Sequence, residues 1–261
     1  ALGNETKDIN HIFLTHSHAD HIADLPFIIE TFFEERSSPL TIYALEETID
    51  VLQKHSFNNK IWPDFTKIKL LKNDNFSLIL KPIKINETIN IHNYFIKAIH
   101  AEHIDGSCGY IVTKKNQSFI ISGDTYINPI LWEEINNNKT IKSLIIECSF
   151  PDKLENLATL TKHLTPSLIA KQLQNLKRKD ISIFFYHLKP TYKKELLNDI
   201  KKHKLLNYQG KILKEGDVIH IDTGNIENTL LSEHKFEEIM KINLAFTSQH
   251  DKKKLLEEIL T

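Results

Sequence analysis

A dense group of metal-capable side chains follows an apolar segment near the start of the chain and restricts the folds open to it. The segment LTHSHADHIADL, Leu14–Leu25, carries these side chains within six residues, namely His16, His18, Asp20 and His21. The preceding INHIFL is largely apolar, which indicates a buried strand. The apolar residues after Asp20 recur at helical spacing up to Glu35. The four side chains are therefore expected on the turn between a strand and a helix.

The chemistry of these four residues points to metal ions. Imidazole and carboxylate together suit zinc, manganese or iron. His16 and His18 are separated by one residue, which places both side chains on one side of an extended segment. Asp20 and His21 lie just beyond, at the start of the helix, and can face a second ion. Two pairs from one loop indicate two ions with open positions rather than one closed structural site.

Two further apolar strands end in metal-capable residues, in ISGD and in FFYH. The pattern predicts strands at 9–14, 40–45, 66–71, 76–85, 88–99, 109–113, 117–121, 142–147 and 181–186, with a hairpin-like stretch at 211–221. It predicts helices at 20–35, 46–55, 127–136, 165–177 and 192–203. Hairpins in the middle and alternating strands and helices later favour a layered α/β (α+β) domain with helices outside and sheets inside.

Composition narrows the function. The chain has 261 residues, with 33 basic and 34 acidic residues and a formal net charge of −1, which argues against a broad nucleic-acid surface. Arg36 and Arg178 are its two arginines, so a metal would have to carry any phosphate chemistry. Cys108 and Cys148 do not indicate a disulfide framework, so we expect the cytoplasm, with the periplasm left open. No apolar run approaches ~18 residues, and no membrane partner is expected.

The segment HSHADH, His16–His21, resembles the HxHxDH signature of the metallo-β-lactamase superfamily. The resemblance implies an αββα sandwich and three further ligands: His103 in HIDGSCGYIV, Asp124 in SGDT and His187 in FFYHLKP. It implies one ion held by His16, His18 and His103. It implies a second held by Asp20, His21 and His187, with Asp124 bridging the two. His100 is the alternative to His103 as the third histidine of the first ion, and the spacing to Gly109 favours His103.

Two other segments resemble the class II cyclic-nucleotide phosphodiesterases. They are TIYALEETIDVLQKHSFNNKIWPDF, Thr41–Phe65, and KHLTPSLIAKQL, Lys162–Leu173, paired with YHLKP. The resemblance covers roughly residues 9 to 220 and implies hydrolysis of 3′,5′-cyclic nucleotides, usually cAMP, to 5′-nucleotides. The expected cofactors are two divalent ions, zinc first, with manganese or iron as options. A metal-bridging hydroxide oriented by Asp20 would attack phosphorus in line with the 3′-oxygen.

Further site residues carry two interpretations each. His163 matches the histidine that related enzymes place opposite the metals and would protonate the leaving group, with Glu147 holding its tautomer. The alternatives are a structural histidine beside a helix and a plain salt bridge. Asn58, Asn59 and Trp62 would contact the nucleobase, or would form a turn and pack in the core.

Both ends of the chain suggest a fragment. The family has strands before the HxHxDH loop, so N-terminal strands are expected to be missing. We expect a phosphodiesterase domain over 1–225 and a helical extension over 226–261, where HKFEEIMKINLAFTSQHDKKKLLEEIL resembles the opening helices of a GAF domain. Two other functions stay open, a ribonuclease Z-like nuclease and a non-enzymatic sensing domain. The expected partner is a small cyclic nucleotide, with a homodimer as one option.

Overall fold

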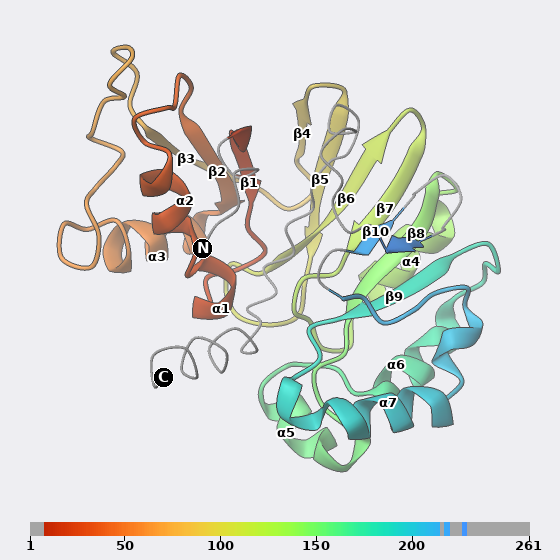
Figure 1. The fold of residues 1–261 in the computed structure, drawn as a ribbon. Coiled ribbons are helices and arrows are strands. Elements are labelled where there is room, and N and C mark those ends of the chain that lie inside the picture. Colours follow the sequence, from red (N-terminus) through yellow and green to blue (C-terminus); the bar gives the residue numbers. More distant parts are fainter. Residues whose placement is uncertain (1–7, 215–216, 220–225, 229–261) are drawn as a thin grey trace.

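The larger of two β-sheets has six strands, in the order β4-β5-β6-β7-β8-β9 (Figure 1). The computed structural model describes residues 8–214, 217–219 and 226–228. The strands are β4 Thr88–Ile91, β5 Tyr94–His100, β6 Cys108–Lys114, β7 Gln117–Ile121, β8 Ile141–Glu147 and β9 Ser182–Tyr186. Pairs from β4 to β7 are antiparallel, whereas β7, β8 and β9 are parallel. Antiparallel hairpins followed by parallel strands with crossover helices are what the sequence pattern predicted.

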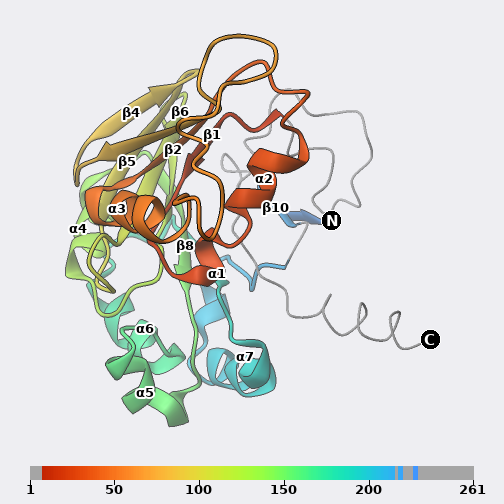
Figure 2. The same ribbon diagram turned by 90° about the vertical axis from the view of Figure 1, so that its left-hand side faces the viewer.

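The smaller sheet joins three parallel strands in the order β1-β2-β3. They are β1 His11–Phe13, β2 Leu40–Leu45 and β3 Leu78–Ile83. Its outer face is covered by α1 Ala19–Ile22, α2 Leu25–Thr31 and α3 Glu46–His55 (Figure 2). A separate antiparallel pair is formed by β10 Asp217–Ile219 and β11 Ile226–Asn228.

The remaining helices lie on the far side of the large sheet. They are α4 Pro129–Asn137, α5 Glu155–Leu160, α6 Pro166–Gln172 and α7 Lys193–Lys202. Short 3₁₀ helices follow or precede them at η2 Asp152–Leu154, η3 Leu173–Asn175, η4 Pro190–Tyr192 and η5 Leu205–Asn207. Thr165 caps α6 by accepting a hydrogen bond from the Leu168 amide, and Pro166 occupies the first helical position, as the sequence indicated.

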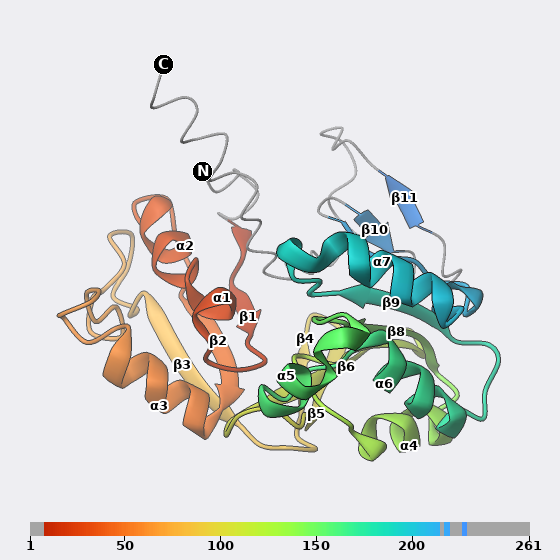
Figure 3. The same cartoon turned by 90° about the horizontal axis from the view of Figure 1, so that it is seen from below.

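Alternate residues of the large sheet enter two different cores. In β9, Phe184 and Tyr186 pack in the core that contains residues of both sheets, whereas Ile183 and Phe185 pack with the helices. A third core lies between the small sheet and its own helices. Three cores separate four layers, helix, sheet, sheet and helix (Figure 3). The predicted αββα arrangement is confirmed.

Some predicted elements were wrong in extent. The helix expected at 20–35 is split after Ile22, because Pro26 has no amide hydrogen and its ring clashes with the carbonyl four residues earlier. The strand expected at 66–71 is a loop with a single bridge between Lys69 and Phe76. The strand expected at 88–99 is broken by His92 and Asn93, whose positive φ angles form a tight turn. The short helix α5 was not predicted.

The C-terminal predictions fall largely outside the described residues. The hairpin-like stretch at 211–221 contains β10, but its partner β11 lies further along the chain. Residues 229–261, which carry the resemblance to a GAF domain, are outside the described part, and the domain boundary at 225 stays a prediction. In the part of the chain that the structure describes, no helix combines the length and the apolar character that a bilayer span requires.

Candidate active site

The predicted ligands meet where strands of both sheets end. The loop after β1 carries His16 and His18, and α1 carries Asp20 and His21. The large sheet contributes three more residues: His103 from the loop between β5 and β6, Asp124 after β7 and His187 after β9. The apolar strands end at this edge, and the polar side chains that follow them reach a shared space outside the core.

The first predicted group of three histidines is assembled. His16, His18 and His103 offer nitrogen atoms that all lie within 4.8 Å of one another. Nε2 of His103 lies 3.1 Å from Nδ1 of His18. The competing residue, His100, instead has its Nε2 3.4 Å from Oε2 of Glu102 and belongs to none of the described ligand groups. The structure therefore places His103 rather than His100 beside His16 and His18.

The second predicted group is assembled beside the first. Asp20, His21 and His187 offer ligand atoms within 4.8 Å of one another. Nε2 of His187 lies 3.3 Å from Oδ2 of Asp20. Asp124 lies between the groups, because its Oδ2 is 3.3 Å from Nε2 of His21 and 3.8 Å from Nε2 of His16. A carboxylate that bridges two ions needs this intermediate position.

Buried atoms without hydrogen-bond partners test whether a metal fits. Among the described residues, Nε2 of His16, Nε2 of His21 and Oδ1 of Asp124 are buried and have no such partner. A buried polar atom without a partner is destabilising, so these three atoms indicate a site for a ligand such as a metal ion. Burial, together with the neighbouring His21, lowers the pKa of His16 to about 2, so its imidazole is neutral and has a lone pair to offer. The residues fit divalent ions.

The outer nitrogen atoms of three histidines are fixed by neighbours. Nδ1 of His103 donates to the carbonyl oxygen of Lys162 over 3.0 Å. Nδ1 of His187 lies 2.9 Å from Oγ of Ser149, and Nδ1 of His16 lies 3.1 Å from Oγ1 of Thr15. The Lys162 carbonyl can only accept, and Ser149 donates its proton to Glu147, so both contacts favour the tautomer of His103 and His187 in which Nε2 carries the lone pair.

Glu147 and His163 form a buried pair next to the ligands. Oε1 of Glu147 lies 2.8 Å from Nδ1 of His163, and Glu147 is fully buried at the end of β8. Burial alone lowers the pKa of His163, but the charge and hydrogen bond of Glu147 outweigh it, so the net shift is upward. The other oxygen of Glu147 accepts a hydrogen bond from Oγ of Ser149 over 2.7 Å. The structure shows a buried Glu147–His163 ion pair, which agrees with the positioning role of Glu147 and with a plain salt bridge alike.

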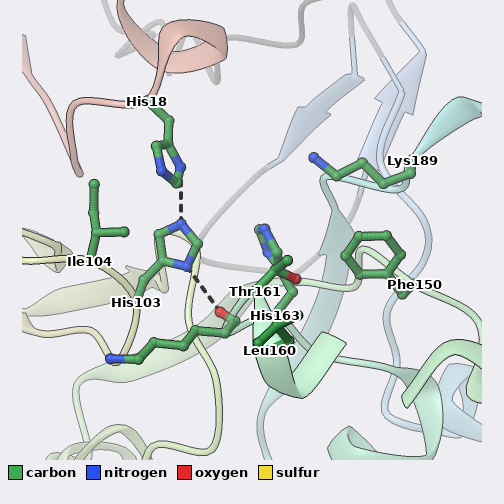
Figure 4. Close-up of a pocket in the computed structure, with 9 residues that line it drawn as sticks. His18, His103, Ile104, Phe150, Leu160, Thr161, His163 and Lys189 are labelled. Atoms are coloured by element: carbon green, nitrogen blue, oxygen red, sulfur yellow. Dashed lines mark hydrogen bonds between the residues drawn. The ribbon is translucent and has the colours of Figure 1, made fainter. Parts of the chain in front are cut away.

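An open pocket of about 560 Å³ adjoins these groups (Figure 4). Its walls are His18, His103, Ile104, Phe150, Leu160, Thr161, Lys162, His163 and Lys189. Ile104, Phe150 and Leu160 make part of the wall apolar, and the side chain of Leu160 is 81% exposed. Sequence reasoning missed Phe150, Leu160 and Lys189, although Lys189 stands two residues after His187 in the YHLKP segment.

The three residues expected to contact a base, Asn58, Asn59 and Trp62, make other contacts in the described structure. Oδ1 of Asn58 accepts hydrogen bonds from the amides of Lys60 and Ile61, and Oδ1 of Asn59 accepts one from Asp64. Trp62 packs edge-to-face with Phe27, at 5.3 Å between ring centroids. None of the three is among the residues that line the pocket. The turn and packing roles account for the contacts seen.

Comparison with known families matches residues 3–88 to the class-II cAMP phosphodiesterases. A probable 3′,5′-cyclic-nucleotide phosphodiesterase of Yersinia pestis is 24% identical over 81% of this chain and 68% of its own length. 3′,5′-cyclic-nucleotide phosphodiesterase 1 of Saccharomyces cerevisiae is 30% identical over 65% of this chain and 51% of its own length. A ribonuclease Z of Methanocaldococcus jannaschii is 30% identical over 37% of this chain.

Solved structures show the same fold. Unliganded yeast PDE1 has a TM-score of 0.67 and 25% identity, covering 80% of this chain and 68% of its own. The metallo-β-lactamase fold protein YhfI of Bacillus subtilis has a TM-score of 0.60 and 15% identity, covering 80% of this chain and 75% of its own. The fold of this chain is the metallo-β-lactamase fold. In sequence, the chain is similar to the class-II cAMP phosphodiesterases over residues 3–88 and to the two 3′,5′-cyclic-nucleotide phosphodiesterases named above.

Proposed function

We propose that this chain, a relative of the class-II phosphodiesterases, hydrolyses 3′,5′-cyclic nucleotides to 5′-nucleotides, with cAMP as the expected substrate. One observation carries the proposal: two adjoining ligand groups meet at Asp124, and the buried Glu147–His163 pair lies beside them. A phosphodiesterase needs both parts, because the attacking water must be activated and the leaving oxygen must receive a proton.

The ligand groups would hold two divalent ions, which we expect to be zinc. His16, His18 and His103 would hold one, Asp20, His21 and His187 the other, and Asp124 would contact both. Bound ions of this kind lower the pKa of water and neutralise the charge on phosphoryl oxygens.

Asp20 would orient the attacking water. The hydrogen bond with His187 is the main cause that holds the pKa of Asp20 below its usual value. Its carboxylate is therefore ionised at neutral pH and can accept a hydrogen bond from water. The side chain of Asp20 is 40% exposed, so one part of it is open to the solvent side of the site.

His163 would give its proton to the 3′-oxygen as the P–O bond breaks. Glu147 contacts Nδ1 of His163, which leaves Nε2 as the nitrogen that can donate to a substrate. The raised pKa of His163 keeps more of the imidazole protonated near neutral pH. Glu147 would act on orientation and charge and would not exchange the proton itself.

The nucleoside would lie against the apolar wall of the pocket. Phe150 and Leu160 lie near His163, whereas Ile104 lies on the His103 side of the pocket (Figure 4). The pocket volume of about 560 Å³ falls within the roughly 300–1,000 Å³ typical of small-molecule sites. Leu160 would then contact the nucleoside, whereas Asn58 and Asn59 are not among the residues that line this pocket.

The test uses the intact gene product loaded with zinc or manganese. Chromatography would follow the conversion of 3′,5′-cAMP to 5′-AMP, with cGMP in parallel and His18→Ala as the inactive control. We expect 5′-AMP from the wild type only. A protein that carries two metals and leaves both cyclic nucleotides intact would contradict the proposal.

The ribonuclease Z alternative has weaker support. The similarity to the Methanocaldococcus jannaschii protein covers 37% of this chain, against 81% for the Yersinia pestis relative. A net charge of −1 also gives little attraction for a tRNA backbone. Incubation with precursor tRNA under the same conditions separates the two, because a nuclease would shorten the RNA and leave cAMP untouched.

A further inference from the structure

The backbone around Lys189 is held on both sides. The amide of Lys189 donates to the carbonyl oxygen of Ser149 over 3.3 Å, and its own carbonyl accepts from the Tyr192 amide over 2.9 Å. Pro190 follows and begins the 3₁₀ helix η4. The backbone of Lys189 is therefore held in position, although the residue lies in a connecting segment after β9.

The amine of Lys189 extends into the pocket. It points across the space toward the side on which His18 and His103 lie (Figure 4). Nζ is 4.0 Å from Oδ2 of Asp20, which is too far for a hydrogen bond, and the side chain is 33% exposed. The ammonium group thus lies near the ligand groups without a short contact to a carboxylate among the described residues.

The second lysine of the pocket wall and the two arginines of the chain are already paired with other groups. Nζ of Lys162, the second lysine of the pocket wall, donates to Oε1 of Glu102 over 2.7 Å. The arginines are committed elsewhere, because Arg36 donates to the carbonyl of Ile9 and Arg178 pairs with Asp180. Of the two described lysines that line the pocket, Lys189 is the one left for an anionic ligand.

We propose that Lys189 binds a non-bridging phosphoryl oxygen of the substrate diester. The inference deepens the proposed function and rests on it. A lysine ammonium offers three N–H donors, and a hydrogen bond between opposite charges is about twice as strong as a neutral one. The diester carries one negative charge, and its phosphoryl oxygens gain charge as water attacks, so the contact strengthens in the transition state.

The test compares Lys189→Met, which keeps the length of the side chain and removes the charge, with Lys189→Arg. Lys194→Met, at an exposed position of α7, is the charge-matched control. Zinc-loaded proteins would be assayed with 3′,5′-cAMP and with bis(p-nitrophenyl) phosphate. We expect kcat/KM to fall about 10- to 100-fold for both diesters in Lys189→Met, to recover largely in Lys189→Arg, and to stay unchanged in Lys194→Met.

A binding measurement gives a readout that does not depend on turnover. Calorimetric titration with 5′-AMP would show a Kd raised about tenfold or more in Lys189→Met. Zinc content by elemental analysis and the Tm of each variant should match the wild type. Loss of zinc or of stability in Lys189→Met, in proportion to the loss of activity, would show a structural role and overturn the proposal.

The two diesters separate failure of this inference from failure of the proposed function. Hydrolysis of the aryl diester without hydrolysis of cAMP would refute the substrate assignment, while the effect of Lys189→Met on the aryl diester would still decide the role of Lys189. If neither diester reacts, the titration decides. Equal affinity of wild type and Lys189→Met for 5′-AMP, or no binding by the wild type, contradicts the proposal.

Discussion

Nδ1 of His103 donates a hydrogen bond to the carbonyl oxygen of Lys162 over 3.0 Å. Lys162 has a left-handed backbone, with φ of 53°, and immediately precedes His163. One unusual turn after α5 therefore orients a candidate metal ligand and presents the candidate acid. This coupling makes the backbone of Lys162, rather than its side chain, the functional part of the residue.

Lys162→Val should disturb this turn, because a β-branched residue in the left-handed region is strained by about 1–2 kcal/mol. We expect lower stability and about 10- to 100-fold weaker zinc binding. Lys162→Gly removes the same side chain and accepts this conformation, so it should stay close to the wild type in zinc affinity. Competition with a zinc-binding dye and urea unfolding measure both effects. Equal zinc affinity for the valine and glycine variants would contradict the role of the turn.

Ser149→Ala should loosen the contact between the two parts of the site. Oγ of Ser149 accepts from Nδ1 of His187 and donates to Glu147. Removing the hydroxyl leaves the Nδ1–H of His187 without its partner, so zinc affinity should fall about 10- to 100-fold. Ser143→Ala is the matched control, since Oγ of Ser143 is buried on β8 with no hydrogen-bond partner in the described part of the chain. Zinc titration of both variants tests this, and equal affinities would disprove it.

Glu147→Gln should change the pH profile of kcat. Burial lowers the pKa of His163, and the Glu147 charge raises it above its ordinary value of 6.5. Without that charge burial dominates, and His163 loses its proton at lower pH. The basic limb of the kcat profile should therefore move to lower pH, with a loss of about 10²- to 10⁴-fold at neutral pH. Glu133→Gln, at an exposed position of α4, should leave the profile unchanged. An unshifted basic limb in Glu147→Gln would argue that His163 is not the acid.

Asp152→Asn should lower stability in a pH-dependent way. Burial raises the pKa of Asp152, but hydrogen bonds from His203, the Ser167 amide and Lys202 together lower it below 3.8. A depressed carboxyl pKa contributes stability above the unfolded value, and this is lost as pH falls through the folded value. We expect a loss of about 1–2 kcal/mol at pH 7 that vanishes as the pH falls through the folded pKa of Asp152. Urea unfolding in chelator, with Asp105→Asn at an exposed position as control, measures it. A pH-independent difference would rule out the charge as its cause.

Metal removal should destabilise the fold as well as abolish turnover. Without ions, the unpaired atoms of His16, His21 and Asp124 stay buried. Saturating zinc at 100 times its Kd should add about 2.7 kcal/mol to the free energy of unfolding. Calorimetric scans with chelator and with zinc test this, and Asp124→Asn should show a much smaller zinc-dependent rise in Tm. A Tm that does not respond to zinc would contradict the metal site.

The layered α/β class and the strand ends that carry ligands followed from local sequence patterns. Apolar strands run toward His16, Asp124 and His187, and each of these residues lies within three positions of the end of its strand. The predictions that were wrong rested on local sequence patterns that strand pairing or packing overrode. Residues 66–71 have strand-like composition, yet a strand forms only where a neighbouring strand supplies its hydrogen bonds.

Tertiary structure alone decided which atoms meet. The bond between His103 and Lys162 joins residues 59 positions apart, and the contact between His187 and Asp20 joins residues 167 positions apart. No local pattern encodes such distances, because sheet order and crossover helices set them. The same holds for Lys189, whose motif was visible in the sequence but whose amine lies beside the site only because the segment after β9 comes close to Asp20 of α1.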